Sequence, residues 1–174
     1  NEIYSSKKGD FRWEENVIPE YVWFNGTVDY TLLGDKIDPT KIVAINSFRG
    51  SAEDSDARIW PVKVMRGKQP YDAGNMTLAI PHTVGKDGFW KTFEWGPALS
   101  KGMAAAGAPF SGDYGFVETS MMWPITHMVA PKEQALDCVS CHAKNGRLEN
   151  VTGVYIPGRD SVSFLDIIGF SILG

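Results

Sequence analysis

The feature that most constrains this chain is the pentad Cys138-Val139-Ser140-Cys141-His142, which contains both of its cysteines. Two thiols three positions apart, with an imidazole directly after the second, indicate a covalent haem attachment site, a redox-active dithiol or part of a zinc site. In the first interpretation the thiols of Cys138 and Cys141 add across the two vinyl groups of one haem, and His142 binds the iron. The motif would then fix the porphyrin and one axial ligand together.

The other two interpretations of the pentad fit the surrounding sequence less well. A thioredoxin-like pair is expected at the start of a helix that follows a buried strand, whereas residues 130–137, APKEQALD, are polar and favour a helix. A structural zinc ion takes four ligands, and Cys138, Cys141, His142 and one more histidine would be crowded. We therefore favour covalent haem c with its iron, and keep the redox pair and the zinc site as alternatives.

A haem iron in an electron carrier favours a second axial ligand, from histidine or methionine. His127 lies in WPITHMV, among apolar residues and close enough in sequence to His142 to serve the same haem, although a neighbouring haem fits equally well. His82, in the loop AIPHTVG, is as compatible with a ligand as with a surface residue. The rival ligands are methionines, which in apolar stretches more often fill gaps in the core: Met121, Met122 and Met128.

Length and charge limit the class of protein. With 174 residues, 43% of them hydrophobic, the chain can bury a core and is expected to form one domain. The net charge of −4 provides no basic field, which disfavours nucleic acids, other polyanions and anionic membrane surfaces as partners.

The predicted fold is mainly α, with irregular loops and short β-hairpins around a haem-organised core. Residues 1–66 contain short apolar runs rich in β-formers, which predict small hairpins and not a large sheet. Prolines are expected to keep these runs short or at sheet edges: Pro19, Pro39, Pro61 and Pro70. From Lys86 the pattern changes, and helices are predicted in DGFWKTF, over 97–107 and from Pro131 through the cysteines.

The two ends of the chain carry different signals. Residues 1–20 have no charged-then-apolar pattern of a secretion signal, although haem attachment to such a motif takes place outside the bacterial cytoplasm. Residues 161–174, SVSFLDIIGFSILG, become steadily apolar but are too short to cross a bilayer, which needs roughly 20 apolar residues. They predict either a short amphipathic helix that packs on the body or the beginning of a membrane anchor.

Several longer stretches resemble one family of multihaem cytochromes c. They are FRWEENVIPEYVWFNGTVDYTLLGDKIDP (11–39), RGKQPYD (66–72), FWKTFEW (89–95), SGDYGFVETSMMWPITHMVAPKEQALDCVSCH (111–142) and NGRL (145–148). Together they resemble the C-terminal part of the octahaem tetrathionate reductase family. The resemblance implies a haem-bearing module over residues 1–160, a periplasmic location and a catalytic haem that lies outside this chain. It also implies that Cys138, Cys141 and His142 hold the last haem and that His127 is a distal ligand.

Two functions from different classes follow. The leading hypothesis is electron transfer within a periplasmic multihaem reductase of sulfur or nitrogen oxyanions, with other haem-bearing segments or subunits and redox proteins as partners. The alternative is a stand-alone monohaem cytochrome c, which requires a distal ligand within this chain. A structural subunit of a cytochrome filament remains a third option without a positive sequence signal.

Overall fold

A computed structural model describes residues 4–5, 9–10, 14–15, 17–126, 130–160 and 164. The chain divides into two compact units. Unit 1 consists of the described parts of Asn1–Val17, Tyr30–Asn46 and Met65–Met121, and unit 2 of those of Ile18–Asp29, Ser47–Val64 and Met122–Gly174. Residues 161–174, apart from Phe164, lie outside the described residues, so the predicted C-terminal helix stays a prediction.

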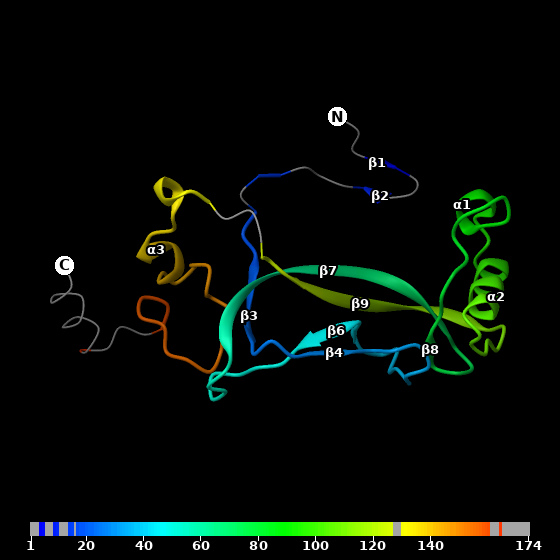
Figure 1. Cartoon of the computed structure of the whole chain (residues 1–174), viewed down its shortest axis with the longest axis horizontal. Helices are drawn as coiled ribbons and strands as arrows, with labels where there is room; N and C mark the ends of the chain where they lie inside the picture. Colours follow the sequence, from blue (N-terminus) through cyan, green and yellow to red (C-terminus); the bar gives the residue numbers. More distant parts are fainter. Residues whose placement is uncertain are drawn as a thin grey trace. The chain divides into compact units, whose positions relative to one another are not determined.

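Strands account for most of the regular structure in the described part of the chain (Figure 1). The strands are β1 (Tyr4–Ser5), β2 (Gly9–Asp10), β3 (Glu20–Phe24), β4 (Val28–Tyr30), β5 (Val43–Ala44), β6 (Asn46–Phe48), β7 (Arg58–Asp72), β8 (Thr77–Leu78) and β9 (Tyr114–Pro124). The largest sheet has the order β3-β7-β9-β5, with β8 also paired to β7, while β1 pairs with β2 and β4 with β6. The helices are α1 (Phe89–Thr92), α2 (Trp95–Ala105), the 3-10 turn η1 (Lys132–Gln134) and α3 (Cys138–Cys141).

The prediction of a mainly α fold was wrong. The longest helix within the described residues, α2, has 11 residues, whereas β7 has 15 and β9 has 11. β9 lies in the half for which helices were predicted, and its alternating burial explains why it is a strand. Val117 and Thr119 are buried, whereas Phe116 and Glu118 are exposed, which is the two-residue period of a sheet face.

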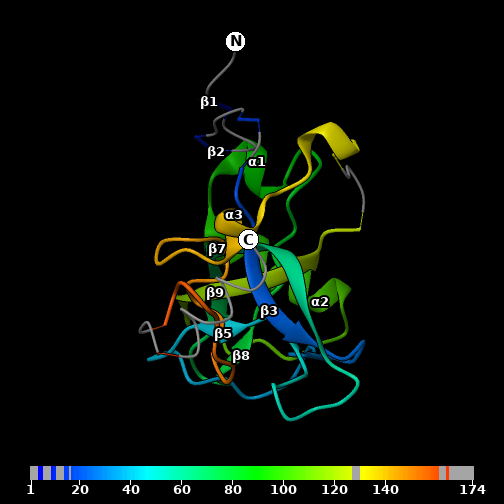
Figure 2. The same ribbon diagram turned by 90° about the vertical axis from the view of Figure 1, so that its left-hand side faces the viewer.

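The prediction of small hairpins in place of a large sheet was also wrong, because prolines do not interrupt β7. Pro61 pairs with Tyr21 across the antiparallel register of β3 and β7, and its carbonyl accepts from the backbone N of Ile125 at 3.0 Å. The carbonyl of Pro70 accepts from the backbone N of Ala79 at 3.0 Å. Each proline removes one donor but leaves its acceptor in use, so the strand continues. Figure 2 shows β3 running beside the first part of β7.

Two of the three predicted helices form, but only one is longer than a single turn. The helix predicted over 97–107 begins earlier, at Trp95, and ends at Ala105, shortly before Gly107 with its φ of +66°. The helix predicted in DGFWKTF is one turn, because Phe93 adopts a left-handed conformation (φ 56°, ψ 27°) and ends it. The continuous helix predicted from Pro131 is broken, since Ala135 is extended between η1 and α3.

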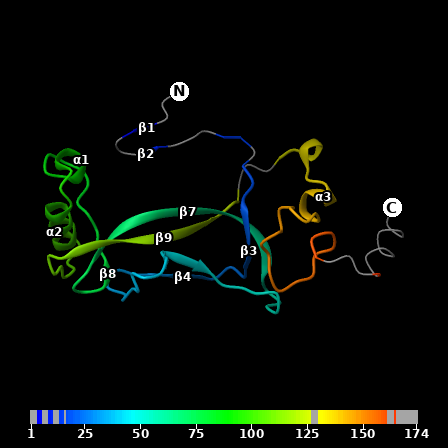
Figure 3. The same cartoon turned by 180° about the vertical axis from the view of Figure 1, so that it is seen from behind.

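The buried apolar core of unit 1 is formed by α2 and the residue that follows β8. Leu99 and Met103 of α2 are almost fully buried with Ala79, and partly buried Trp95, Ala108 and Phe110 pack against them. Figures 1 and 3 show α2 near β8, with α1 at the other end of α2. Within the described residues, no helix has both the length and the apolar character needed for a membrane crossing.

Candidate functional site

The pentad lies on α3, a single helical turn in unit 2. Asp137 starts this turn: its Oδ1 accepts from the backbone N of Ser140 at 2.8 Å and from Ser140 Oγ at 2.5 Å. The hydrogen bond from the Ser140 side chain holds the pKa of Asp137 below its ordinary value, so the cap is ionised near neutrality. Because an aspartate cap satisfies free backbone N–H groups, it fixes the first helical residue at Cys138.

The turn places the three chemically important side chains on one side. The backbone N of His142 donates to the carbonyl of Cys138 at 2.8 Å, which is a helical bond between positions i and i+4. Residues three and four positions apart are neighbours on a helix surface, so Cys141 and His142 both adjoin Cys138. Neither thiol is in a disulfide; Cys138 and His142 are exposed and Cys141 is half-buried. Two accessible thiols and an adjacent imidazole fit the attachment chemistry of a c-type haem.

The surroundings of α3 differ from those of a buried redox pair. The preceding segment is η1 followed by extended residues, none of them buried, and no strand precedes the cysteines between residues 130 and 137. Among the described residues, no group of three or more histidine, cysteine, aspartate or glutamate side chains is placed to hold a metal ion.

Two glycines fit closely around the backbone of the motif. A Cβ at Gly146 would lie 2.6 Å from the carbonyl oxygen of Cys141, and a Cβ at Gly158 would lie 1.8 Å from that of His142. Gly158 also has a φ of +83°. The chain from 142 to 158 therefore folds back on the pentad, and only glycine fits at the point of contact.

A substitution tests this close approach. Gly158→Ala is expected to destabilise the protein by about 3 kcal/mol, because the added methyl group meets the His142 carbonyl in addition to the strain of a left-handed backbone. Gly112→Ala is the matched control, since Gly112 has a φ of +94° and open space around its Cβ position. It should cost only about 1 kcal/mol. Denaturant unfolding measures the stability of both variants. Equal losses of stability in Gly158→Ala and Gly112→Ala would show that the close approach to the His142 carbonyl makes no energetic difference.

Arg159 closes the segment that follows the motif. Its guanidinium forms a fork with Asp160, with Nε to Oδ1 and Nη2 to Oδ2 both at 2.9 Å. It also donates to the carbonyls of Leu148 at 2.9 Å, Val154 at 3.0 Å and Val151. The paired guanidinium holds the pKa of Asp160 below its ordinary value. One half-buried side chain thus ties three loop carbonyls together directly after α3.

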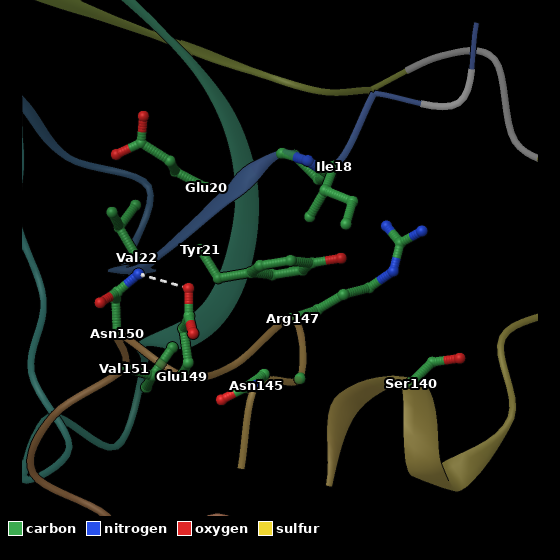
Figure 4. Close-up of a pocket in the computed structure, with 12 residues that line it drawn as sticks. Ile18, Glu20, Tyr21, Val22, Ser140, Asn145, Arg147, Glu149, Asn150 and Val151 are labelled. Carbon is green, nitrogen blue, oxygen red and sulfur yellow. Dashed lines mark hydrogen bonds between the residues drawn. The ribbon is translucent and has the colours of Figure 1, made fainter. Parts of the chain in front are cut away.

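A pocket of about 650 Å³ adjoins α3 within unit 2 (Figure 4). One wall comes from Ile18, Pro19 and the first half of β3, and the other from Ser140, residues 145–147 and residues 149–151. The lining mixes apolar side chains with the phenol of Tyr21 and the guanidinium of Arg147. The volume lies in the range of ordinary ligand and cofactor sites.

The two predicted distal histidines have different outcomes. His127 lies outside the described residues. His82 lies in the loop between β8 and α1 of unit 1, as predicted, and its backbone is held by Ala98 O at 2.8 Å and Phe89 N at 2.9 Å. Its Nε2 is 3.6 Å from Asp87 Oδ1, and Asp87 also pairs with Lys101. The structure therefore brings Cys138, Cys141 and His142 together, while His82 belongs to the other unit.

Comparison with known proteins identifies the family. The family model described as "Cytochrome c bacterial" matches residues 1–145, which include the whole pentad. The chain belongs to this bacterial cytochrome c family. The cytochrome is also similar to a crystal structure titled octaheme cytochrome c from Shewanella oneidensis, with 40% sequence identity and a TM-score of 0.77. That similarity covers 87% of this cytochrome and 37% of the Shewanella chain, and no curated protein matches.

Family membership gives the cofactor and the general activity. A cytochrome c holds its haem covalently, so this cytochrome carries haem c with its iron and its function is haem-based electron transfer. When bound, the haem supplies an iron that gains and loses one electron. The protein supplies the attachment groups and a fixed geometry around them, and the assignment of these roles to Cys138, Cys141 and His142 stays a prediction.

Sequence reasoning singled out the pentad of this cytochrome, whose role as the attachment site stays a prediction, but it did not indicate the residues that shape its surroundings. Asp137 carries a readable signal, because an aspartate three residues before a serine on a short helix is a capping pattern. Gly158 and Arg159 follow a proline in IPGRD, which indicates a turn but not what the turn contacts. The pocket has no sequence signal, since β3 and residues 145–151 are more than a hundred positions apart.

Proposed function

We propose that this chain is the C-terminal haem-bearing part of a periplasmic multihaem reductase of the octahaem tetrathionate reductase type. In this role it passes electrons between its own haem and neighbouring haems, and the reduction of sulfur or nitrogen oxyanions takes place at a haem outside this chain. The observation that carries the proposal is the 40% identity to an octahaem cytochrome of which this chain spans only 37%. A single Cys-x-x-Cys-His pentad in 174 residues supports it, because the remaining protein then serves as a wall for haems held elsewhere.

Each residue of the pentad has a separate role in the proposal. Cys138 and Cys141 form the two thioether bonds, and His142 is the proximal ligand. The Asp137 cap and the contact of Gly158 with the His142 carbonyl support these roles, because they fix the turn that carries all three side chains. A fixed turn keeps the imidazole at a constant position while the iron changes its charge, which lowers the reorganisation that electron transfer requires.

The number of haems and polypeptides in each particle tests the proposal. Native mass spectrometry of the protein purified from its source is expected to show further haem groups, either in a longer chain or in an associated subunit. A particle with one polypeptide and one haem would overturn the proposal and support the stand-alone monohaem carrier. Fractionation of the source cells into periplasm and membranes tests the proposed location and whether residues 161–174 begin an anchor.

His127 is proposed as the distal ligand of a haem, and its replacement gives a direct optical test. His127→Ala is expected to convert one haem from a low-spin to a high-spin spectrum, because removal of a strong-field imidazole leaves a weak ligand or an open position. His82→Ala is the comparison, and a spectral change there would assign the ligand to the Asp87-associated histidine instead. A low-spin spectrum that persists in the His127 variant would contradict the role of His127.

A further inference from the structure

The pocket beside α3 contains two polar groups that the described residues leave without partners. Tyr21 and Arg147 both line it, and within the described part of the chain neither the Tyr21 hydroxyl nor the Arg147 guanidinium has a hydrogen bond or ion pair. Arg147 is held in place through its backbone, whose N donates to the Ser140 carbonyl at 2.8 Å. A half-buried guanidinium with unused donors is suited to a carboxylate or another planar acceptor.

The rest of the lining indicates what carries that acceptor. Ile18 and Val22 provide apolar surface on one wall and Val151 on the other. In Figure 4 the side chains of Tyr21 and Arg147 both extend toward the side of the pocket where Ile18 lies. Two carboxylates also line the pocket, but Glu149 is bonded to Asn150 Nδ2 at 3.4 Å and Glu20 has a partner as well. The occupant therefore needs an apolar body and an anionic group at the end nearest Arg147.

We propose that this pocket is a haem propionate site, in which Arg147 and Tyr21 donate hydrogen bonds to a propionate carboxylate while the apolar residues contact the porphyrin edge. The proposal rests on the proposed function in that it requires a haem beside α3, either attached at the pentad or carried by a neighbouring segment. A haem joins an apolar macrocycle to two carboxylates, which matches both halves of the lining. The sequence analysis assigns no role to Tyr21 or Arg147, and the site adds a specific electrostatic contact to the general electron-transfer role.

Two haems can supply the propionate. Ser140 lines the pocket, and it lies two positions after Cys138, on the side of α3 away from the attachment face. Because a helix is only about 10 Å in diameter, the pocket begins within one helix width of the thiols. The propionate belongs either to the haem attached at α3 or to a haem carried by another segment, and the test distinguishes these two sources.

The test compares the reduction potentials of matched variants in the haem-loaded protein. Arg147→Met removes a cation beside the carboxylate and is expected to lower the midpoint potential of one haem, because uncompensated negative charge favours the ferric state. Arg147→Lys keeps the positive charge and should leave the midpoint potential close to that of the unsubstituted protein. Tyr21→Phe should lower the midpoint potential by less than Arg147→Met does. Lys144→Met is the control, since Lys144 is exposed, lies two residues after His142 and does not line the pocket.

The source of the propionate follows from which preparation responds. A shift of the single haem in the 174-residue chain assigns the carboxylate to the haem on α3. A shift only in the larger haem-bearing particle assigns it to a neighbouring haem. Equal shifts in the Arg147→Met and Lys144→Met variants, or no shift in either preparation at normal haem content, would overturn the proposal. Absence of covalent haem from the unsubstituted protein would instead contradict attachment at the pentad. A haem assay therefore distinguishes failure of the propionate site from failure of the proposed function.

Discussion

Replacing both Cys138 and Cys141 with serine in the 174-residue chain is expected to abolish its covalent haem attachment completely. Serine hydroxyls do not add to the haem vinyl groups under the conditions in which thiols do, so no thioether bond can form. After denaturing electrophoresis the variant should show no haem-dependent peroxidase stain, and its mass should equal that of the polypeptide alone. Any haem that remains would be held only through His142 and would leave on acid extraction.

Single substitutions and a control within the same turn sharpen this test. Cys138→Ser and Cys141→Ser should each retain one thioether bond, with a ferrous absorption maximum at longer wavelength because one vinyl group stays conjugated. Val139→Ser keeps both thiols and changes an exposed side chain of the same helical turn, so it should stain like the unsubstituted protein. Covalent haem in the double variant would show that another residue provides the linkage and would reject the assignment of the pentad.

The close spacing of the pentad side chains was predictable because it depends on residue types at fixed positions in one short segment. Cys138, Cys141 and His142 meet wherever the backbone forms one helical turn, and this requires no knowledge of the tertiary fold. The pocket was not predictable, because Tyr21 and Arg147 come together only after residues far apart in sequence have folded. Local chemistry is readable from sequence, whereas a site built from distant segments depends on the packing of both.

The fold was predicted poorly for a related physical reason. The helix at α2 was found because Pro97 near its start and Gly107 after its end act within a few residues. β7 and β9 depend on pairing with distant strands, as in the bonds between Ile45 N and Ser120 O or between Thr119 Oγ1 and Gly67 O. Strand formation reflects burial and cross-strand neighbours more than intrinsic preference, so single-sequence patterns underestimate it.

A buried carboxylate in unit 1 is expected to contribute strongly to stability. Asp72, at the end of β7, is fully buried, and its carboxylate accepts from the backbone N of Gly74, Asn75 and Ser111 and from the side chains of Asn75 and Ser111, at 2.5 to 3.0 Å. Burial alone would raise its pKa, but the hydrogen bonds led by that of Ser111 lower it from 3.8 to about 2. The site is built for the charged form.

Asp72→Asn should therefore reduce the free energy of unfolding at pH 7 by about 3 kcal/mol, because an amide turns an NH₂ group toward donors that need an acceptor. The pH dependence has a defined sign. Since the pKa of Asp72 is lower in the folded than in the unfolded protein, its ionisation stabilises the fold above about pH 4 by about 2 kcal/mol. That contribution is lost as the pH falls through about 2. The difference in unfolding free energy between the unsubstituted protein and the Asp72→Asn variant should therefore shrink there.

Asp113→Asn separates this effect from a general loss of surface charge. Asp113 is exposed and lies two residues after Ser111, so its substitution should change stability by no more than about 0.5 kcal/mol at any pH. Denaturant unfolding of the unsubstituted protein, the Asp72→Asn variant and the Asp113→Asn variant, measured from pH 2 to pH 7 (~5 pH units), provides the comparison. Because all five donors converge on one carboxylate, the loss at Asp72 should be cooperative and should loosen the end of β7 and the segment that begins at Ser111 together. If the two variants lose the same free energy of unfolding at every pH, the buried hydrogen bonds of Asp72 contribute no net stability relative to hydrogen bonds with water.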